Sequence, residues 1–228
     1  MRQITDAILE RRFARDAPLT ALDAGCGTGF NVVHLSTRTL NPVFGLDISA
    51  DAVRFTAKRG LRRLCQASVT DIPFQSETFD LVTSFEVICQ GQPPPVEAGL
   101  REMRRVLRPG GFLFVRVPAY RWMRSSHDVD VDTTRRFTRP EFQGIVSQAG
   151  LHVEWISYAN CFLFPAVLAR RALKRVGLGE GSDVRAFPPA LAWLNSVFRG
   201  TLGVEAELFR HNIPLPFGLS IVCLAQKH

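Results

Sequence analysis

A glycine-rich stretch near the start of the chain has the composition of a turn that binds a nucleotide. Asp23 is followed by glycines at positions 25, 27 and 29, within the segment LDAGCGTGF at 22–30. Glycines allow a positive φ and a close approach of the backbone to a ligand. A helix that starts after them would point free N–H groups and the positive end of its dipole at that ligand. The spacing is DxGxGxG, whereas GxGxxG would have favoured a dinucleotide.

A second carboxylate, Asp47, closes the next apolar run, FGLDIS at 44–49. A carboxylate at the end of that strand can accept hydrogen bonds from both hydroxyls of an adenosine ribose. The plainer alternative is a residue that caps a helix or forms a turn. Because the glycine turn precedes it, we favour the role in ribose binding.

The elements that must hold these residues alternate along the first 150 residues. Apolar runs predict strands at 19–24, 43–47, 61–66, 79–85 and 111–117. Helices are expected at 3–15, 30–38, 49–58 and 95–107, with Ser49 as an N-cap. This alternation predicts a parallel sheet wrapped by helices.

The last third of the chain has a different rhythm. A helix is expected at 139–149 after Thr138 as N-cap, followed by strands at 151–158 and 219–225. The roughly sixty residues between those strands are too many for a plain connection. We therefore predict a mostly helical insertion at 159–213.

Five motifs in register resemble the class I S-adenosylmethionine-dependent methyltransferases, especially the small-molecule group called type 11. They span about residues 20–118 and comprise the glycine turn, Asp47, IPF at 72–74, FDLV at 79–82 and LRPGG at 107–111. The resemblance implies an α/β fold, a Rossmann-like seven-stranded mostly parallel sheet with an antiparallel last strand and helices on both faces. It also implies S-adenosyl-L-methionine as cofactor. We expect one methyltransferase domain over 1–228, in which the helical insertion at 159–213 is a lid or substrate-binding element.

The same resemblance implies which residues bind the cofactor. Asp47 would bind the ribose hydroxyls, and Ile48 would flank the adenine. Ser68, followed by Val69, stands where relatives carry an Asp near the adenine amine, so only an uncharged acceptor remains. Phe85 would face the reactive methyl group. The methionine and ribose part would lie along Asp23, Ala24, Gly25, Cys26 and Gly27.

His127 is the preferred candidate for a general base. Methyl transfer depends mainly on in-line placement of the nucleophile, and a base matters when that nucleophile must lose a proton. His127 follows the fifth strand, and Asp128 or Asp130 could orient it. The alternative is a surface-loop histidine. Many relatives have another histidine before an Arg-Arg-aromatic stretch, but here Thr133 holds that place, so that base is missing.

Glu86 is the second catalytic candidate, because the end of the fourth strand faces the cofactor in this family. The alternative is a structural hydrogen bond, which we consider the better interpretation. Cys89 lies where relatives often have a histidine, and we expect a buried, unreactive thiol. No cluster of metal-ligating residues is visible in the sequence.

The composition of the chain indicates the cellular compartment and the classes of partner to be expected. Five scattered cysteines without a CxxC pair favour reduced thiols in a cytoplasmic protein over zinc or disulfides. The first thirty residues lack the apolar core of a secretory signal, and no run is long enough to span a membrane. A formal charge of +7 is compatible with nucleic acid, an anionic membrane surface, or neither. The sequence leaves the oligomeric state open.

The insertion bears on the substrate. An apolar segment at 161–168 precedes a basic one at 170–175. Such a segment can rest on an anionic membrane as a peripheral contact, or close a pocket with its cations in solvent. Both interpretations predict an apolar acceptor. We expect methylation of O, N or C of a hydrophobic small molecule; the alternatives are a lipid-linked or quinone-type acceptor at a membrane surface, or RNA. RNA is supported by charge alone, and no RNA-binding module is evident.

Overall fold

The computed structural model describes residues 2–91, 95–175 and 193–228. Its centre is one seven-stranded sheet in the order β3-β2-β1-β4-β5-β7-β6. β7 runs antiparallel to both of its neighbours, and the other pairs are parallel. The expected sheet with an antiparallel last strand is therefore confirmed. The strands are β1 (Ala21–Ala24), β2 (Val43–Asp47), β3 (Leu64–Gln66), β4 (Phe79–Phe85), β5 (Leu107–Pro118), β6 (His152–Ala159) and β7 (Ser220–Gln226).

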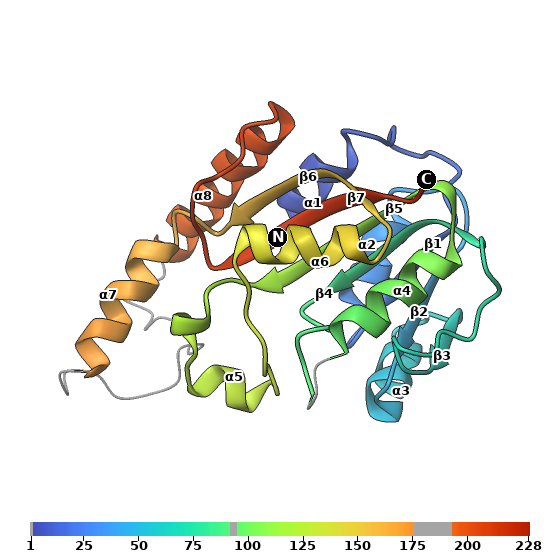
Figure 1. Ribbon diagram of the computed structural model, residues 1–228, viewed down its shortest axis with the longest axis horizontal. Coiled ribbons are helices and arrows are strands. Elements are labelled where there is room, and N and C mark those ends of the chain that lie inside the picture. Colours follow the sequence, from blue (N-terminus) through green and yellow to red (C-terminus); the bar gives the residue numbers. More distant parts are fainter. Residues whose placement is uncertain (1, 92–94, 176–192) are drawn as a thin grey trace.

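Helices cover both faces of this sheet, as Figure 1 shows. On one face, α4 (Val96–Val106) and α6 (Arg139–Gln148) bury Leu100, Met103 and Phe142 against the strands. On the other face, α1 (Arg2–Leu9) and α2 (Phe30–Ser36) form a second core. α3 (Ala50–Lys58) lies beside β2 and β3. Two short helical turns, η1 (Arg121–Met123) and α5 (Ser126–Asp130), follow β5. Burial of apolar side chains on both faces is what stabilises a layered α/β fold.

Most element boundaries agree with the sequence predictions. Ser49 caps α3 by accepting a hydrogen bond from the N–H of Ala52 at 3.2 Å. Thr138 stands at the N-cap of α6, where its N–H donates to Glu141 at 3.4 Å. Two predictions of element limits were wrong. α1 ends at Leu9 and continues only as turns, although the sequence suggested a helix to residue 15. β5 begins at Leu107, so the LRPGG segment is part of the strand.

In the described part of the segment between β6 and β7, where an insertion was expected, the chain forms two helices. They are α7 (Phe164–Arg175) and α8 (Trp193–Arg210); residues 176–192 lie outside the described part. α8 packs against α1 through Ala206 and Phe209, while α7 extends beyond the sheet (Figure 1). Fully buried Glu205 accepts hydrogen bonds from the N–H groups of Asn160 and Phe162, at 2.7 and 3.1 Å. This carboxylate therefore fixes α8 to the start of the insertion.

Within the described residues, no helix has both the length and the apolar character needed to cross a bilayer.

Candidate functional site

A cavity of about 890 Å³ opens at the carboxyl ends of the first four strands. The sheet order reverses between β1 and β4, and ligands bind at such a switch point in open α/β sheets. Each of the four strands supplies lining residues just at or after its last residue. They include Gly25 and Gly27 after β1, Asp47 and Ile48 at β2, Ser68 and Val69 after β3, and Phe85 and Glu86 at β4.

The glycine turn shapes one wall of this cavity. Gly25 has φ of +87°, and a Cβ there would lie 2.2 Å from Cγ2 of Val87. Gly27 has φ of +50°, and a Cβ there would meet no atom within 4 Å. The first glycine is thus required by packing, whereas the absence of a side chain at the second leaves room for a ligand against the backbone. α2 begins directly after the turn.

Asp47 joins the end of β2 to the glycine turn. Its Oδ2 accepts a hydrogen bond from the N–H of Gly27 at 2.8 Å, and its Oδ1 accepts one from the N–H of Ser49 at 2.9 Å. The carboxylate lies at the cavity wall and each oxygen has further acceptor capacity. This arrangement suits a ligand with adjacent hydroxyl groups.

Asp23 lies behind the glycine turn and does not line the cavity. Its Oδ1 accepts hydrogen bonds from Asn31 Nδ2 and Thr83 Oγ1, each at 2.7 Å. Burial raises the pKa of Asp23 to about 6, although these two hydrogen bonds act in the opposite direction. The side chain therefore holds β1, α2 and β4 together below the turn. Contact with a cofactor would be indirect.

The sequence-predicted binding residues separate into two groups. Seven of them line the cavity: Gly25, Gly27, Asp47, Ile48, Ser68, Val69 and Phe85. Asp23, Ala24 and Cys26 are buried outside the lining. Burial also raises the pKa of the Cys26 thiol to about 12, so it stays protonated at neutral pH. These three residues support the turn and do not form the cavity surface.

The end of the cavity near Ser68 is polar. Ser68 Oγ lies 2.8 Å from Thr70 Oγ1 and accepts a hydrogen bond from the Thr70 N–H at 3.2 Å. Thr70 also lines the cavity. Ile48, on the neighbouring strand end, is 72% exposed and provides an apolar surface there. A flat ring bound between Ile48 and the hydroxyls of Ser68 and Thr70 could pack against the isoleucine side chain and form a hydrogen bond with a hydroxyl.

Glu86 lines the cavity, but its carboxylate has a structural partner. Its Oε1 accepts a hydrogen bond from Arg116 Nε at 2.9 Å, and Ser220 Oγ lies 3.4 Å away. Its backbone has φ of +60°, which is unusual for a residue other than glycine. The same arginine lies 5.1 Å from the centroid of the Phe85 ring. Glu86 thus joins the ends of β4, β5 and β7 at the cavity edge.

Comparison with known proteins assigns the part of the chain that builds this cavity. Residues 22–115 match the family model described as a methyltransferase domain. The segment contains the glycine turn, Asp47, Ser68 and Glu86. Residues 22–115 are a class I methyltransferase domain. S-adenosylmethionine is the cofactor of this domain, as the resemblance of the five motifs had implied.

Several proteins are similar to the chain beyond this domain. The fatty-acid O-methyltransferase of Mycolicibacterium smegmatis is 30% identical over 58% of the chain and 43% of that protein. The tRNA N(3)-methylcytidine methyltransferase of Drosophila melanogaster is 27% identical over 60% of the chain and 50% of that protein. The chain thus spans half or less of the length of these curated relatives.

Solved structures share the fold at low sequence identity. Geranyl diphosphate C-methyltransferase from Streptomyces coelicolor is 17% identical with a TM-score of 0.65, covering 99% of this chain and 75% of that one. The protein solved with the Haloferax volcanii Trm112 methyltransferase activator is 21% identical with a TM-score of 0.63, covering 100% and 89%. At such identities the likeness establishes the fold.

The backbone of His127 lies in α5, while its side chain is outside the described part of the structure. The expected orienting partner, Asp128, is engaged elsewhere. Asp128 is 2% exposed, and its Oδ1 accepts hydrogen bonds from Arg136 at 2.6 and 3.1 Å. Its Oδ2 accepts one from the N–H of Ser125 at 2.6 Å. Asp128 therefore fixes the loop after β5 to the segment that precedes α6.

Further cavity residues escaped the sequence analysis. Gln90, Arg101 and Asp132 also line the cavity. Arg101 lies on α4 and carries no motif, so no local signal marks it. Asp132 reaches the cavity because its carbonyl accepts a hydrogen bond from the N–H of Gly91 at 3.2 Å. That pairing of distant segments is visible only in the folded chain.

Cys89 is fully buried beneath the cavity, and burial raises the pKa of its thiol. Such a thiol stays protonated and unreactive at neutral pH, as expected from the sequence. Among the described residues, no group of three or more histidine, cysteine or acidic side chains could hold a metal ion.

Proposed function

We propose that this methyltransferase domain transfers a methyl group from S-adenosylmethionine to O, N or C of a hydrophobic small-molecule acceptor. When bound, the cofactor supplies the sulfonium methyl group that the acceptor's nucleophile attacks. The observation that carries the apolar character of the acceptor is a chain of aromatic side chains that starts at the carboxyl end of β5. We refer to it as the aromatic cluster: Tyr120, Trp122, Tyr158, Phe164 and Phe217.

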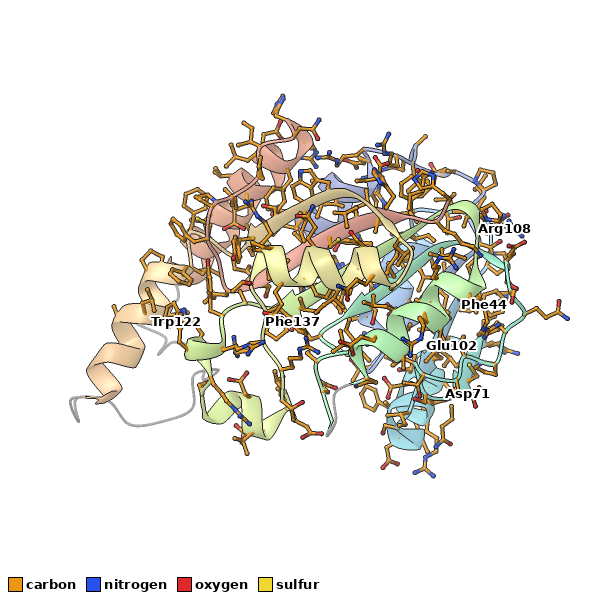
Figure 2. The ribbon with its side chains drawn as sticks, in the orientation of Figure 1. Phe44, Asp71, Glu102, Arg108, Trp122 and Phe137 are labelled. Carbon is orange, nitrogen blue, oxygen red and sulfur yellow. The ribbon has the colours of Figure 1, made fainter. Side chains whose placement is uncertain are left out.

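The aromatic cluster runs from the sheet to the surface. Tyr158 on β6 is 7% exposed and stacks on Tyr120, with ring centroids 5.1 Å apart. Tyr120 stacks on Trp122 at 5.5 Å, and Trp122 contacts Phe164 of α7 at 6.2 Å. Trp122 is 58% exposed and lies at the end of the molecule where α7 extends (Figure 2). Trp122 and Phe217 are exposed at the surface end of the cluster, and exposed aromatic side chains of this kind support binding of an apolar molecule.

In the proposed binding mode, residues of the cavity wall hold the cofactor. Asp47 accepts hydrogen bonds from the ribose hydroxyls, and Ile48 flanks the adenine, whose amine donates to Ser68. Gly25, Gly27, Val69 and Phe85 contact the rest of the cofactor. The glycine turn is held in place by Asp23, Ala24 and Cys26, which do not contact the cofactor directly. Support comes from the positions of the lining residues and from the open space at Gly27.

His127 remains the proposed general base, with Glu86 as the second candidate. The Arg116 partner of Glu86 favours a structural role for that carboxylate. A base typically contributes 10²- to 10⁴-fold to kcat. We therefore expect His127→Asn to lower kcat about a hundredfold and to remove the acidic limb of its pH profile. If Glu86→Gln shows that loss and His127→Asn does not, the two assignments are reversed.

The domain organisation is part of the proposal. We propose that residues 1–228 form one methyltransferase domain and that 159–213 acts as a lid over the acceptor site. Two contacts support this arrangement: Phe164 of α7 belongs to the aromatic cluster, and Glu205 of α8 holds the first turn of the insertion. Phe164→Ala should leave cofactor affinity within about threefold while raising the acceptor KM.

A lipid-type acceptor reached at a membrane surface is the second candidate. It is supported by the exposure of Trp122, Phe162 and Phe217, at 58%, 44% and 39%, beside the basic segment 170–175. Apolar rings with nearby cations favour an anionic interface. Cosedimentation with vesicles that contain phosphatidylglycerol, and none with phosphatidylcholine alone, would support this candidate. If the protein cosediments with neither kind of vesicle, the lipid-type acceptor is rejected and the hydrophobic small molecule remains the proposed acceptor.

The direct test is methyl transfer with labelled S-adenosylmethionine. Panels of hydrophobic phenols, amines and carboxylic acids should accept label, and Trp122→Ala should raise KM about tenfold with little change in kcat, because burial of an aromatic side chain contributes roughly 1–3 kcal/mol. Leu40→Ala is a matched control, since Leu40 is 75% exposed and lies far along the chain from the aromatic cluster. Labelling of RNA, and of no small molecule, would overturn the proposed function.

A further inference from the structure

A second cavity of about 390 Å³ is lined mainly by arginines, and one of them, Arg121, lies between Tyr120 and Trp122 of the aromatic cluster in the chain. We call it the arginine pocket. It is built by two segments, the loop around η1 after β5 and the strand-like segment that precedes α6. Its lining residues are Arg121, Arg124, Thr133, Thr134, Arg135 and Arg136.

The four arginines have different surroundings. The Arg136 side chain is only 11% exposed, and its charge is neutralised by Asp128 at 2.6 Å. Arg136 also donates to the carbonyl of Ala119 at 2.8 Å, so it holds the two segments together. This arginine is therefore a structural element of the pocket and is not free to bind a ligand with its full charge.

The other three arginines are less fully neutralised. Arg121 and Arg135 share one carboxylate, Glu141, at 2.7 and 3.5 Å. Arg135 also lies 3.2 Å from Glu97, which is 53% exposed. Arg124 is exposed and forms no ion pair with any residue that the structure describes. Among the described residues, the four guanidinium groups of the pocket therefore have three carboxylate partners, which are Asp128, Glu141 and Glu97. The remaining positive charge is that of Arg124.

The arginine pocket adjoins the cofactor cavity through a shared wall. Asp132 lines the cofactor cavity, and the next four residues, 133–136, line the arginine pocket. Thr134 Oγ1 donates to the carbonyl of Gly91 at 2.5 Å, which ties this wall to the cofactor cavity. A molecule in the arginine pocket would therefore lie next to the cofactor site.

The pocket also adjoins the aromatic cluster. Tyr120 and Trp122 alternate with Arg121, and Arg124 follows on the same short segment. The ring of Tyr120 stacks on Tyr158, and the N–H of Arg139 donates to the Tyr158 hydroxyl at 3.1 Å. One end of this surface is thus apolar and the other is cationic. Such a surface matches a molecule with an apolar body and an anionic end.

We propose that the arginine pocket binds a phosphate or diphosphate group on the acceptor. The inference rests on the proposed function and narrows it to amphipathic phosphate esters. Guanidinium groups pair with the multiple oxygens of a phosphate through charge-assisted hydrogen bonds. Arg121 and Arg124 are exposed, and Arg135 and Thr133 line the same cavity, so the several oxygens of a phosphate can pair with more than one guanidinium group.

Calorimetry with octyl phosphate, inorganic phosphate and octanoate tests the proposal. We expect octyl phosphate to bind at least tenfold more tightly than either of the other two. Inorganic phosphate lacks the apolar chain, and octanoate offers the arginines fewer oxygens and a smaller negative charge. Arg121→Gln and Arg124→Gln should each weaken octyl phosphate binding about tenfold, the loss expected for a hydrogen bond to a charged group. Trp122→Ala should weaken octyl phosphate binding without changing the binding of inorganic phosphate.

Arg54→Gln is the matched control. Arg54 is 73% exposed, pairs only with neighbouring Asp51 among described residues, and lies on α3. It should bind octyl phosphate like the unchanged protein. The substituted arginines at 121 and 124 are exposed, so thermal unfolding should confirm that both variants fold.

The outcomes separate this proposal from the proposed function. Equal binding of octyl phosphate and octanoate, or arginine variants that bind like Arg54→Gln, would overturn the phosphate assignment. S-adenosylhomocysteine binding is measured in every variant and should stay within threefold. If S-adenosylhomocysteine binds normally while octyl phosphate does not bind, only the arginine pocket has been misassigned. If S-adenosylhomocysteine does not bind to the unchanged protein, the proposed function has failed. Binding of a short RNA that depends on Arg124, with none of octyl phosphate, would also overturn the proposal.

Discussion

Asp47 accepts a hydrogen bond from the backbone N–H of Gly27 at 2.8 Å, and this bond links the end of β2 to the turn after β1. The two residues belong to separate motifs of the sequence. Their contact shows that the glycine turn and the second carboxylate form one wall of a single cavity. Binding of an adenosine ribose would add to a carboxylate that the fold has already oriented, which lowers the entropic cost of binding.

Replacing Asp47 with alanine should weaken S-adenosylhomocysteine binding about a hundredfold, since hydrogen bonds to a charged acceptor contribute roughly 1.5–3 kcal/mol each. Asp51→Ala is the control, because Asp51 is 85% exposed on α3. Isothermal titration calorimetry measures both variants. An Asp47→Ala affinity equal to that of Asp51→Ala would show that the ribose contact is misplaced.

Gly25→Ala should destabilise the fold more than Gly60→Ala. Both glycines have φ close to +88°, so the backbone strain of an added Cβ is similar, roughly 1–3 kcal/mol. Only at Gly25 would the Cβ also clash, at 2.2 Å from Val87. Overpacking should add about 1–3 kcal/mol to the loss of unfolding free energy, measured by urea denaturation. Equal losses in both variants would contradict the crowding described at the turn.

The stability of the protein should depend on pH through Asp23. Its pKa is raised from 3.8 to about 6 in the folded protein, so between these values the folded state binds more protons than the unfolded state. The contribution of Asp23 to stability is thus present below pH 3.8 and is lost as pH rises to about 6, by on the order of 3 kcal/mol. Asp23→Asn should flatten the unfolding free energy over this window, as measured by urea denaturation at several pH values. A slope identical to that of the unchanged protein would contradict the assignment.

Glu205→Ala should loosen the junction between β6 and α7. Glu205 is fully buried and accepts hydrogen bonds from the N–H groups of Asn160 and Phe162. Truncation leaves these donors without their partner, at a cost of about 1–3 kcal/mol each. Glu207→Ala, on the exposed face of the same helix at 58% exposure, serves as control and should cost under 1 kcal/mol. Urea denaturation that fails to separate the two variants would contradict the role of Glu205.

The sheet was predictable because its strands carry their own local signals. The limits of β2 and β4 follow from short apolar runs that end at Asp47 and Phe85. α1 was predicted too long, because apolar spacing continues past Leu9 although the chain there forms only turns. β5 was predicted too short, because Pro109 and Gly110 indicate a turn by composition yet lie within the strand. Leu107 pairs with Phe79, the register then shifts, and pairing resumes at Phe112, so the segment between them is an irregularity within the strand, with Gly110 at φ +79°.

Much of the cavity wall was predictable from the sequence, whereas the arginine pocket was not. Gly27, Asp47 and Ser68 lie in motifs with a fixed spacing, and the structure brings them to one cavity. The sequence did not indicate that Asp128 is neutralised by Arg136, or that Arg121 and Arg135 share Glu141. These contacts join segments whose proximity depends on the path of the chain after β5. Periodicity carries no information about such loop-to-loop contacts.

The most direct test is calorimetry of the purified protein with S-adenosylmethionine, S-adenosylhomocysteine and NAD. The cavity and the DxGxGxG spacing predict that the first two bind with one site per chain and a dissociation constant of roughly 1–100 μM, near −5.5 to −8 kcal/mol. NAD should show no measurable binding, because the turn lacks the GxGxxG spacing. Tight binding of NAD would contradict the assignment of this cavity as the cofactor site. So would the absence of binding of both S-adenosylmethionine and S-adenosylhomocysteine up to millimolar concentration.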